Sequence, residues 1–247
     1  MSKITQPFVK AALELSDNGQ SKLNEREREV YGLSSTRLRS LINNLCSKPD
    51  TNYLEVGTYR GATLISAAYG NPTCKVVGID NFMYDEREPK RVPPKGYIWD
   101  NMKSQLEANL GRYADSGTGL NIKNISFIQS DFQSADLVEF PSFDLCFFDV
   151  SPVNAAIYDD FFNLILTKMS ATSVVVFSAY SNVSHAKELD EAFSRHADKV
   201  DVAWKEQRIS NGTSDSTQYF SGIGIFGITK KAIAKPVVKP VAVTKKS

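Results

Sequence analysis

One stretch of the chain places an acid and two glycines at a spacing that suits ligand binding. An apolar run delivers Glu55 and Gly57, and Gly61 follows four residues later, where a helical pattern begins. A strand–turn–helix junction of this kind directs backbone N–H groups at a ligand. A second apolar run, 76–79, ends in Asp80, twenty-three residues after Gly57. An acid at that position, at the tip of the next parallel strand, is suited to bind both hydroxyls of a ribose, so the two features predict a nucleoside-containing cofactor.

The residue two positions after Gly57 helps to choose between cofactors. Dinucleotide sites need a glycine there, because the backbone must approach the pyrophosphate closely, but this chain has Tyr59. S-adenosylmethionine contains a ribose and no pyrophosphate, and its carboxylate can accept hydrogen bonds from N–H groups at a helix start. The motif therefore favours S-adenosylmethionine over NAD. An ordinary α/β turn with incidental glycines is the alternative interpretation of the motif alone.

The motif also resembles that of a known family. It reads Glu55-Val56-Gly57-Thr58-Tyr59-Arg60-Gly61-Ala62-Thr63 and is similar to the Glu-x-Gly-x-x-x-Gly-x-Ser/Thr motif of the catechol and macrocin O-methyltransferase groups. The chain thus resembles class I S-adenosylmethionine-dependent methyltransferases over about residues 50–229. The resemblance implies a Rossmann-like α/β fold, with helices on both faces of a seven-stranded, mostly parallel sheet of order 3-2-1-4-5-7-6. It also implies methyl transfer to an oxygen of a small-molecule or sugar-like acceptor.

Composition limits the other possibilities. The chain has 247 residues with 42% hydrophobic and 23% charged residues, which is typical of a soluble α/β domain. A net charge of +1 gives no reason to expect nucleic acid as a partner, and no apolar run approaches the ~20 residues that span a membrane. Three scattered cysteines match no zinc spacing or disulfide framework, so we expect a cytoplasmic protein. The small-molecule partner is what the resemblance implies. The oligomeric state is not predicted.

Three parts are expected along the chain. Residues 1–48 form an N-terminal helical extension or lid, 49–229 the S-adenosylmethionine-binding domain, and 230–247 a disordered tail rich in Lys, Pro, Val and Ala. Alternating patterns after residue 50 predict a parallel sheet covered on both faces. Strands are expected over 52–57, 74–80, 124–130, 143–149, 173–177, 199–208 and 219–229. The polar loop 81–98 is expected to be an acceptor lid or a plain surface excursion, and Ser184 is expected to cap the helix that follows the fifth strand.

Four expected strand ends close on an acid: Glu55, Asp80, Asp131 and Asp149. Ligands bind beyond the carboxyl ends of parallel strands, so these side chains are candidates for one site. The resemblance implies a role for each: Glu55 for the methionine amino group, Asp80 for the ribose, Asp131 for the adenine amino group, and Asp149 nearest the transferred methyl. Phe132 is expected to pack on the adenine. The full set of expected cofactor-binding residues is Glu55, Gly57, Thr58, Tyr59, Gly61, Asp80, Asn81, Asp131, Phe132 and Asp149.

Candidate catalytic residues are fewer. Asp149 is expected to orient the acceptor, while His185 and Tyr180, which follow the fifth strand, are candidates for the base that removes the acceptor proton. Catechol-type enzymes hold a metal with an Asp-Asn pair at the end of that strand, but this chain has Ser178-Ala179 there. Because Ala179 has no ligand atom and hard cations prefer several oxygen ligands, we expect no metal site.

Three alternatives differ in class. The first is a protein of the same fold that binds the cofactor but has lost catalysis, which the weak set of residues after the fifth strand leaves open. The second, an aminopropyltransferase, usually has paired acids after the fourth strand, and Asp149-Val150-Ser151-Pro152 lacks the second acid. The third, a methyltransferase acting on nucleic-acid bases, usually has an Asn/Asp-Pro-Pro-aromatic motif, which the same four residues do not supply.

Overall fold

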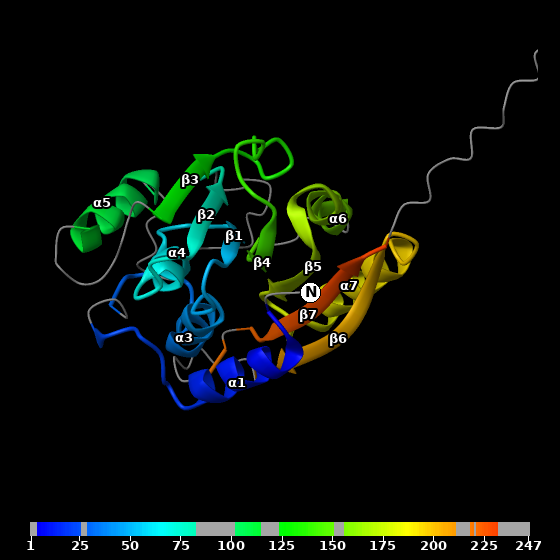
Figure 1. The fold of residues 1–247 in the computed structure, drawn as a ribbon, viewed down its shortest axis with the longest axis horizontal. Helices are drawn as coiled ribbons and strands as arrows, with labels where there is room; N and C mark the ends of the chain where they lie inside the picture. The colour runs from blue at the N-terminus through cyan, green and yellow to red at the C-terminus, as the bar shows by residue number, and fades with distance from the viewer. Residues whose placement is uncertain are drawn as a thin grey trace, which may run out of the picture.

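A seven-stranded sheet forms the centre of the protein (Figure 1). The computed structural model describes residues 4–25, 29–82, 102–114, 124–150, 156–210, 218–219 and 221–231. The strands are β1 (Asn52–Val56), β2 (Lys75–Asp80), β3 (Ile125–Gln129), β4 (Phe143–Phe148), β5 (Met169–Phe177), β6 (Val200–Arg208) and β7 (Ile223–Lys230). Their order is β3-β2-β1-β4-β5-β7-β6. β7 runs in the opposite direction to the other six strands, so its pairs with β5 and β6 are antiparallel and the remaining pairs are parallel. The expected fold class and strand order are confirmed.

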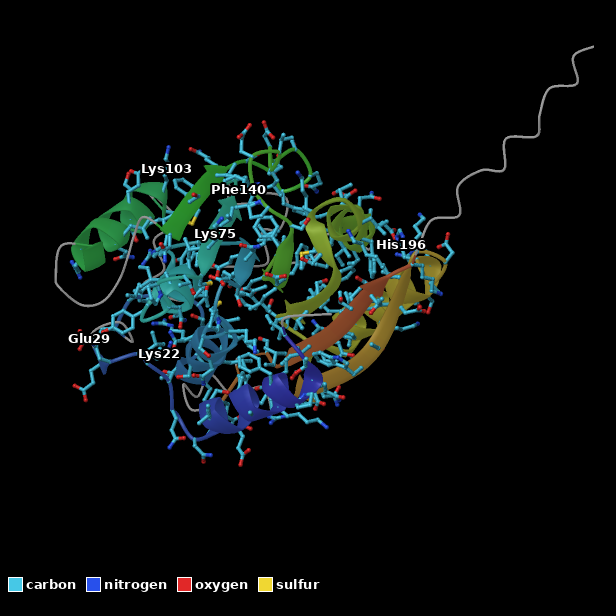
Figure 2. All side chains as sticks on the ribbon, viewed as in Figure 1. Lys22, Glu29, Lys75, Lys103, Phe140 and His196 are labelled. Atoms are coloured by element: carbon cyan, nitrogen blue, oxygen red, sulfur yellow. The ribbon has the colours of Figure 1, made fainter. Side chains whose placement is uncertain are left out.

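Helices cover both faces of this sheet. Successive strand residues alternate between two core clusters, with Tyr53 in the first and Leu54 in the second, as period-2 strand geometry requires. Residues of α1 (Gln6–Asp17), α3 (Thr36–Leu45) and α4 (Ala62–Ala68) fill the first cluster. Residues of α6 (Ala156–Lys168) and α7 (Val183–Arg195) fill the second, and α5 (Met102–Ala114) contributes Leu106 to the first. Figure 2 shows side chains filling the space between the sheet and both helical layers.

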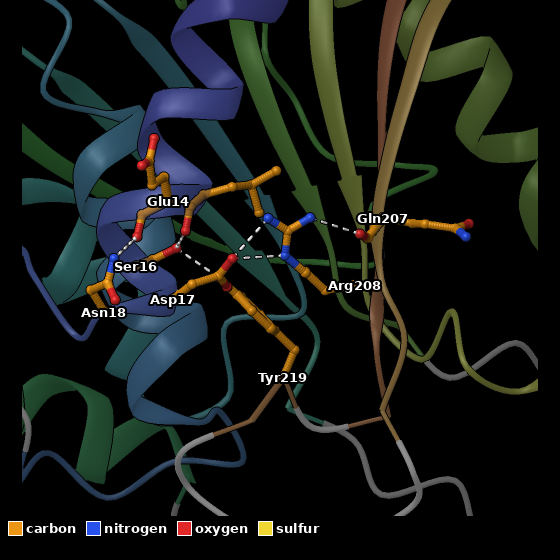
Figure 3. Close-up of polar contacts among 8 residues, drawn as sticks. Glu14, Ser16, Asp17, Asn18, Gln207, Arg208 and Tyr219 are labelled. Atoms are coloured by element: carbon orange, nitrogen blue, oxygen red, sulfur yellow. Dashed lines mark hydrogen bonds and ion pairs between the residues drawn. The ribbon is translucent and has the colours of Figure 1, made fainter.

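The end of α1 is joined to the segment between β6 and β7 (Figure 3). The hydroxyls of Ser16 and Tyr219 lie 2.6 Å apart, and both side chains are buried. Arg208 donates from Nη2 to Asp17 at 2.8 Å. The chain's first helix is therefore held against its last strand pair, and α1 and α3 share one core cluster with the sheet. The division at residue 48 into an extension and a domain stays a prediction.

Some details differ from expectation or lie outside the described residues. Strand β5 begins at Met169, four residues before the expected start. The cap of α7 is Asn182, whose side chain accepts from the N–H groups of Ser184 and His185, so the expected Ser184 cap is wrong. Most of the expected 81–98 loop, from residue 83, lies outside the described residues, as does the tail from residue 232. No helix in the described ranges has the length and hydrophobicity needed to cross a bilayer.

Candidate functional site

The turn after β1 lies directly against the end of β4. Gly57 has φ +93°, and a Cβ at this position would overlap the backbone oxygen of Asp149. Two backbone hydrogen bonds hold this approach, from Gly57 N–H to Ile79 and from Asp149 N–H to Val56, both at 2.9 Å. Because no other residue type fits this space and this conformation, glycine is required here. The turn brings Asp149 beside the loop that the sequence predicted to bind the cofactor.

The loop from Gly57 to the first residue of α4 has an unusual backbone. Tyr59 has φ +50° and Gly61, the N-cap of α4, has φ +80°. A Cβ at Gly61 would overlap the side chain of Leu106 on α5. Thr58 is buried and donates from its hydroxyl to the carbonyl of Ile79 at 3.3 Å. Left-handed conformations cost energy for residues with a Cβ, so neighbouring contacts must hold Tyr59 in place.

Asp80 provides one such contact. One carboxylate oxygen accepts from the backbone N–H of Tyr59 at 2.7 Å, and the other accepts from that of Phe82 at 2.7 Å. Burial raises the pKa of Asp80, and these amide hydrogen bonds oppose that rise. An ionised carboxylate has about four acceptor positions, so each oxygen can still accept a hydroxyl. Asp80 therefore joins the loops after β1 and β2 and retains the capacity to bind a ribose.

The ends of β2 and β3 are joined by a polar pair. Asn81 donates from its side-chain amide to Asp131 at 2.7 Å, and Ser130 N–H donates to the carbonyl of Asp80 at 3.1 Å. Asp131 is exposed, whereas Phe132 is only 7% exposed and meets Phe148 edge to face at 5.5 Å. The ring of Phe132 belongs to the second core cluster, so its expected packing on an adenine stays a prediction.

Glu55 is completely buried next to the loop 57–61. The hydroxyl of Tyr53 donates to one carboxylate oxygen at 2.6 Å, and that of Thr63 donates to the other at 2.9 Å. Burial raises the pKa of Glu55 to about 8, which the two hydrogen bonds oppose and the carboxylates of Asp149 and Asp80 reinforce. Three of the four predicted acids therefore interact electrostatically at one point of the sheet edge. A cation bound there would favour the ionised form of Glu55.

The two candidate bases after β5 have different surroundings. Tyr180 is 6% exposed, lies over Gly224, and meets the ring of Phe226 at 5.9 Å, so it belongs to the second core cluster. The ammonium of Lys205 lies 4.8 Å from the centre of the Tyr180 ring. His185 is in the first turn of α7 and is partly buried. Of the three catalytic candidates, Asp149 is the one that the structure places against the Gly57 turn.

Sequence reasoning missed three residues at this site. Tyr53 and Thr63 hold the carboxyl of Glu55, and Arg60 is a 9% exposed cation within the loop 57–61. The i, i+2 spacing of Tyr53 and Glu55 could have revealed the first contact, since alternate strand residues share a face. The contact of Arg60 with Tyr31, at 4.5 Å from the guanidinium carbon to the ring centre, joins residues far apart in sequence and had no local signal.

Metal-binding side chains do not gather in the part of the chain that the structure describes: no group of three or more His, Cys, Asp or Glu residues there could hold an ion. His196 lies at the C-terminal end of α7 (Figure 2), where it meets Asp159 at 3.0 Å and stacks on Phe162. It lies at the opposite end of α7 from His185.

Comparison with known proteins finds similarity in structure only. No family model and no curated protein matches the sequence. The structure is similar to TrmN from Thermus thermophilus, with TM-score 0.52 and 17% identity over 83% of this chain, which spans 52% of the TrmN chain. It is also similar to the O-methyltransferase TomG from Streptomyces achromogenes in complex with S-adenosylmethionine (TM-score 0.52, 16% identity, 93% and 92% of the two chains). A third similar structure is the Podospora anserina methyltransferase PaMTH1 with bound S-adenosylhomocysteine (TM-score 0.51, 14% identity, 93% and 89%).

These similarities establish the fold. PaMTH1 is a methyltransferase and TomG an O-methyltransferase by name, and identities of 14–17% carry no residue-level equivalence. The protein therefore has the fold of class I S-adenosylmethionine-dependent methyltransferases, and the roles of its residues must be argued from its own geometry.

Proposed function

We propose that this chain binds S-adenosylmethionine beside the Gly57 turn and transfers its methyl group to an oxygen of a small molecule. The observation that carries the proposal is the position of Asp80, whose carboxylate lies between the Tyr59 and Phe82 amides next to that turn. A carboxylate fixed there, with acceptor positions to spare, matches the two hydroxyls of a ribose. The similarity to cofactor-bound TomG and PaMTH1 supports the choice of cofactor.

Other residues have proposed roles around this cofactor. Gly57, Thr58, Tyr59 and Gly61 shape the loop against the methionine portion, and the buried Glu55 carboxyl lies on its ammonium side. Asp131, held by Asn81, lies at the end of β3, where it can accept from the adenine amino group, with Phe132 behind it. These assignments place the nucleoside along the ends of β2 and β3 and the methionine at the end of β1.

Methyl transfer needs positioning more than acid–base chemistry. S-adenosylmethionine bound here would supply an electrophilic methyl group, and a side chain of this protein would take the proton that the acceptor hydroxyl loses. We assign the orientation of the acceptor to Asp149, because its backbone contacts the cofactor turn. His185 and Tyr180 remain candidates for the base, and His185 is the more accessible of the two.

The cofactor assignment is tested by calorimetry with S-adenosylhomocysteine and NAD. We expect S-adenosylhomocysteine to bind and NAD to bind more weakly or not at all. Asp80→Ala should weaken S-adenosylhomocysteine by about 1–3 kcal/mol, since the ribose hydroxyls lose their acceptor and the loop loses its anchor. Asp136→Asn is the control, because that exposed carboxylate also accepts a backbone N–H, from Val138, outside the site.

Two outcomes would contradict the proposal. Tighter binding of NAD would overturn the cofactor assignment, and unchanged affinity in Asp80→Ala would overturn the ribose contact. Catalysis is read separately, as S-adenosylhomocysteine released from S-adenosylmethionine over a panel of phenolic and sugar hydroxyl acceptors. Cofactor binding with no release over such a panel would favour the catalytically inactive interaction protein.

A further inference from the structure

Two of the three cysteines lie together at the amino edge of the sheet. Cys46 is the C-cap of α3, Cys74 directly precedes β2, and each is 1% exposed. Both are free thiols of the first core cluster, and their side chains are in hydrogen-bonding contact. Cys146 belongs to the second core cluster, so the sheet separates it from the other two. The fold therefore forms one pair of neighbouring thiols from residues far apart in sequence.

Hydrogen bonds on both sides of this pair hold its two segments together. On one side, the side-chain amide of Asn71 donates to the carbonyl of Asn43 at 3.0 Å. On the other, the backbone N–H of Lys75 donates to the carbonyl of Thr51 at 2.9 Å. Each cysteine lies between these two contacts along its own segment, so the segments cannot separate at the thiols without breaking one of them. The contact between the thiols is therefore imposed by the surrounding backbone.

Burial affects the rate and the equilibrium of thiol oxidation differently. Burial, and then the contact with Cys74, raise the pKa of the Cys46 thiol well above its ordinary value. Because the thiolate is the reactive form, the closed native state reacts slowly with an external oxidant. The flanking residues 48–50 and 72–73 are exposed, so opening of this edge brings the pair to solvent. At equilibrium, two thiols held in contact have a high effective concentration for each other, and this favours the disulfide.

We propose that Cys46 and Cys74 are a redox modification site, at which a small disulfide such as oxidised glutathione converts the two thiols into a disulfide bond. The protein thiols lose two electrons and two protons through a mixed disulfide, and the oxidant is reduced to two glutathione thiols. The new bond would close a ring that contains β1, the loop 57–61 and α4. Such a ring restricts the unfolded chain, so the oxidised protein should be the more stable form. This inference does not depend on the proposed function.

A variant that keeps only this pair provides the test. Any intramolecular disulfide in Cys146→Ala must join Cys46 to Cys74. The variant is equilibrated with oxidised glutathione in urea below its unfolding midpoint, where transient opening admits the reagent, and its remaining thiols are counted by alkylation and intact mass. We expect most molecules to lose both thiols without gaining glutathione. Urea unfolding should then give an equilibrium constant of unfolding roughly 30- to 1,000-fold smaller for the oxidised than for the reduced protein.

The matched control is Cys74→Ala, which leaves Cys46 and Cys146 on opposite faces of the sheet and should form no intramolecular disulfide. Two retained thiols in Cys146→Ala, or glutathione attached to either of them, would overturn the proposal. A disulfide that leaves stability unchanged or lowers it would show that the native structure does not accommodate the bond, and would overturn it as well. If Cys146→Ala does not fold, peptide mapping of the oxidised wild-type protein answers the same question, because it identifies which two cysteines are linked.

Discussion

On the sheet face covered by α1, α3 and α4, buried polar side chains share the core with apolar ones, whereas the face covered by α6 and α7 is filled by aromatic rings. The buried polar residues of the first face include Arg39, Ser40, Asn43, Glu55, Thr63, Ser66 and Asn71. The rings of the second face include Phe148, Phe161, Phe162, Phe177, Phe193 and Phe226. The predicted cofactor loop is attached to the first face through α4.

The polar face is held by directional contacts. Asn43 donates from its side-chain amide to the carbonyls of Ser66 and Tyr69, both at 2.8 Å, and accepts from the N–H of Lys22 at 3.0 Å. These bonds tie α3 to the C-terminal half of α4, and at the other end of α4 Thr63 donates to Glu55 on β1. Hydrogen bonds fix one arrangement where apolar packing tolerates several, so this face sets the position of α4 and of the loop before it.

The aromatic face has a different role. Phe161 is fully buried and its ring lies 4.4 Å from that of Phe148 and 5.1 Å from that of Phe177. Such contacts are favourable and bury a large apolar area per residue. We infer that the aromatic face supplies much of the folding free energy, while the polar face fixes the geometry of the site.

The largest expected effect comes from the aromatic face. Phe161→Ala should lower the free energy of unfolding by about 3–5 kcal/mol, because it leaves a cavity among rings that cannot all collapse. Denaturant unfolding followed by circular dichroism measures this loss. Cofactor affinity per folded molecule should remain within about twofold of wild type. A large loss of affinity in the folded fraction would contradict the division of roles between the two faces.

A smaller effect, with a distinctive pH dependence, is expected from Glu55 on the polar face. The pKa of this carboxyl is raised from 4.5 to about 8 in the folded protein, so between these values the native state keeps a proton that the unfolded chain has lost. The free energy of unfolding must therefore fall as pH rises through this window. Glu55→Gln should remove that dependence, which we expect to amount to ~2–4 kcal/mol between pH 5 and pH 8.

Urea unfolding at several pH values checks this prediction. Glu14→Gln, at an exposed position on α1, is the control and should retain the wild-type slope. Parallel pH profiles for wild type and Glu55→Gln would show that Glu55 is ionised in the native state at neutral pH. In that case the polar face would contain a buried charge, and the two faces would differ in charge as well as in polarity.

Much of the fold could be predicted from local patterns. Period-2 and period-3.6 hydrophobicity located the strands and most helices. The motif around Gly57 located the turn after β1, because glycine is the usual residue where a turn requires a positive φ or a close backbone approach. The cap of α7 was misassigned to Ser184, since Asn182 and Ser184 are both good capping residues and only the geometry after Ala179, with its φ of +56°, decides between them.

The site was harder to predict where it depends on contacts distant in sequence. The acids at the strand ends follow from sheet topology, but the hydrogen bonds of Asp80 to two backbone amides depend on loop conformations that no spacing encodes. The surroundings of Tyr180 were equally hidden, because its ring lies over Gly224, forty-four residues later in the chain. Side-chain type predicted which groups could react, and tertiary packing decided which of them lie together.

The smallest expected effect is at the rim of the polar face, where α1 meets β6. Arg208 donates from Nε and Nη2 to one oxygen of Asp17, and the pKa of Arg208 is raised chiefly by this hydrogen bond. The side chain of Asp17 is 31% exposed and that of Arg208 is 34% exposed, so water and salt screen the pair. Asp17→Asn should therefore lower the free energy of unfolding by only ~0.5–1 kcal/mol at low salt, and by less in 0.5 M NaCl. A loss above about 2 kcal/mol, unaffected by salt, would show that the rim is part of the buried network that positions the cofactor loop.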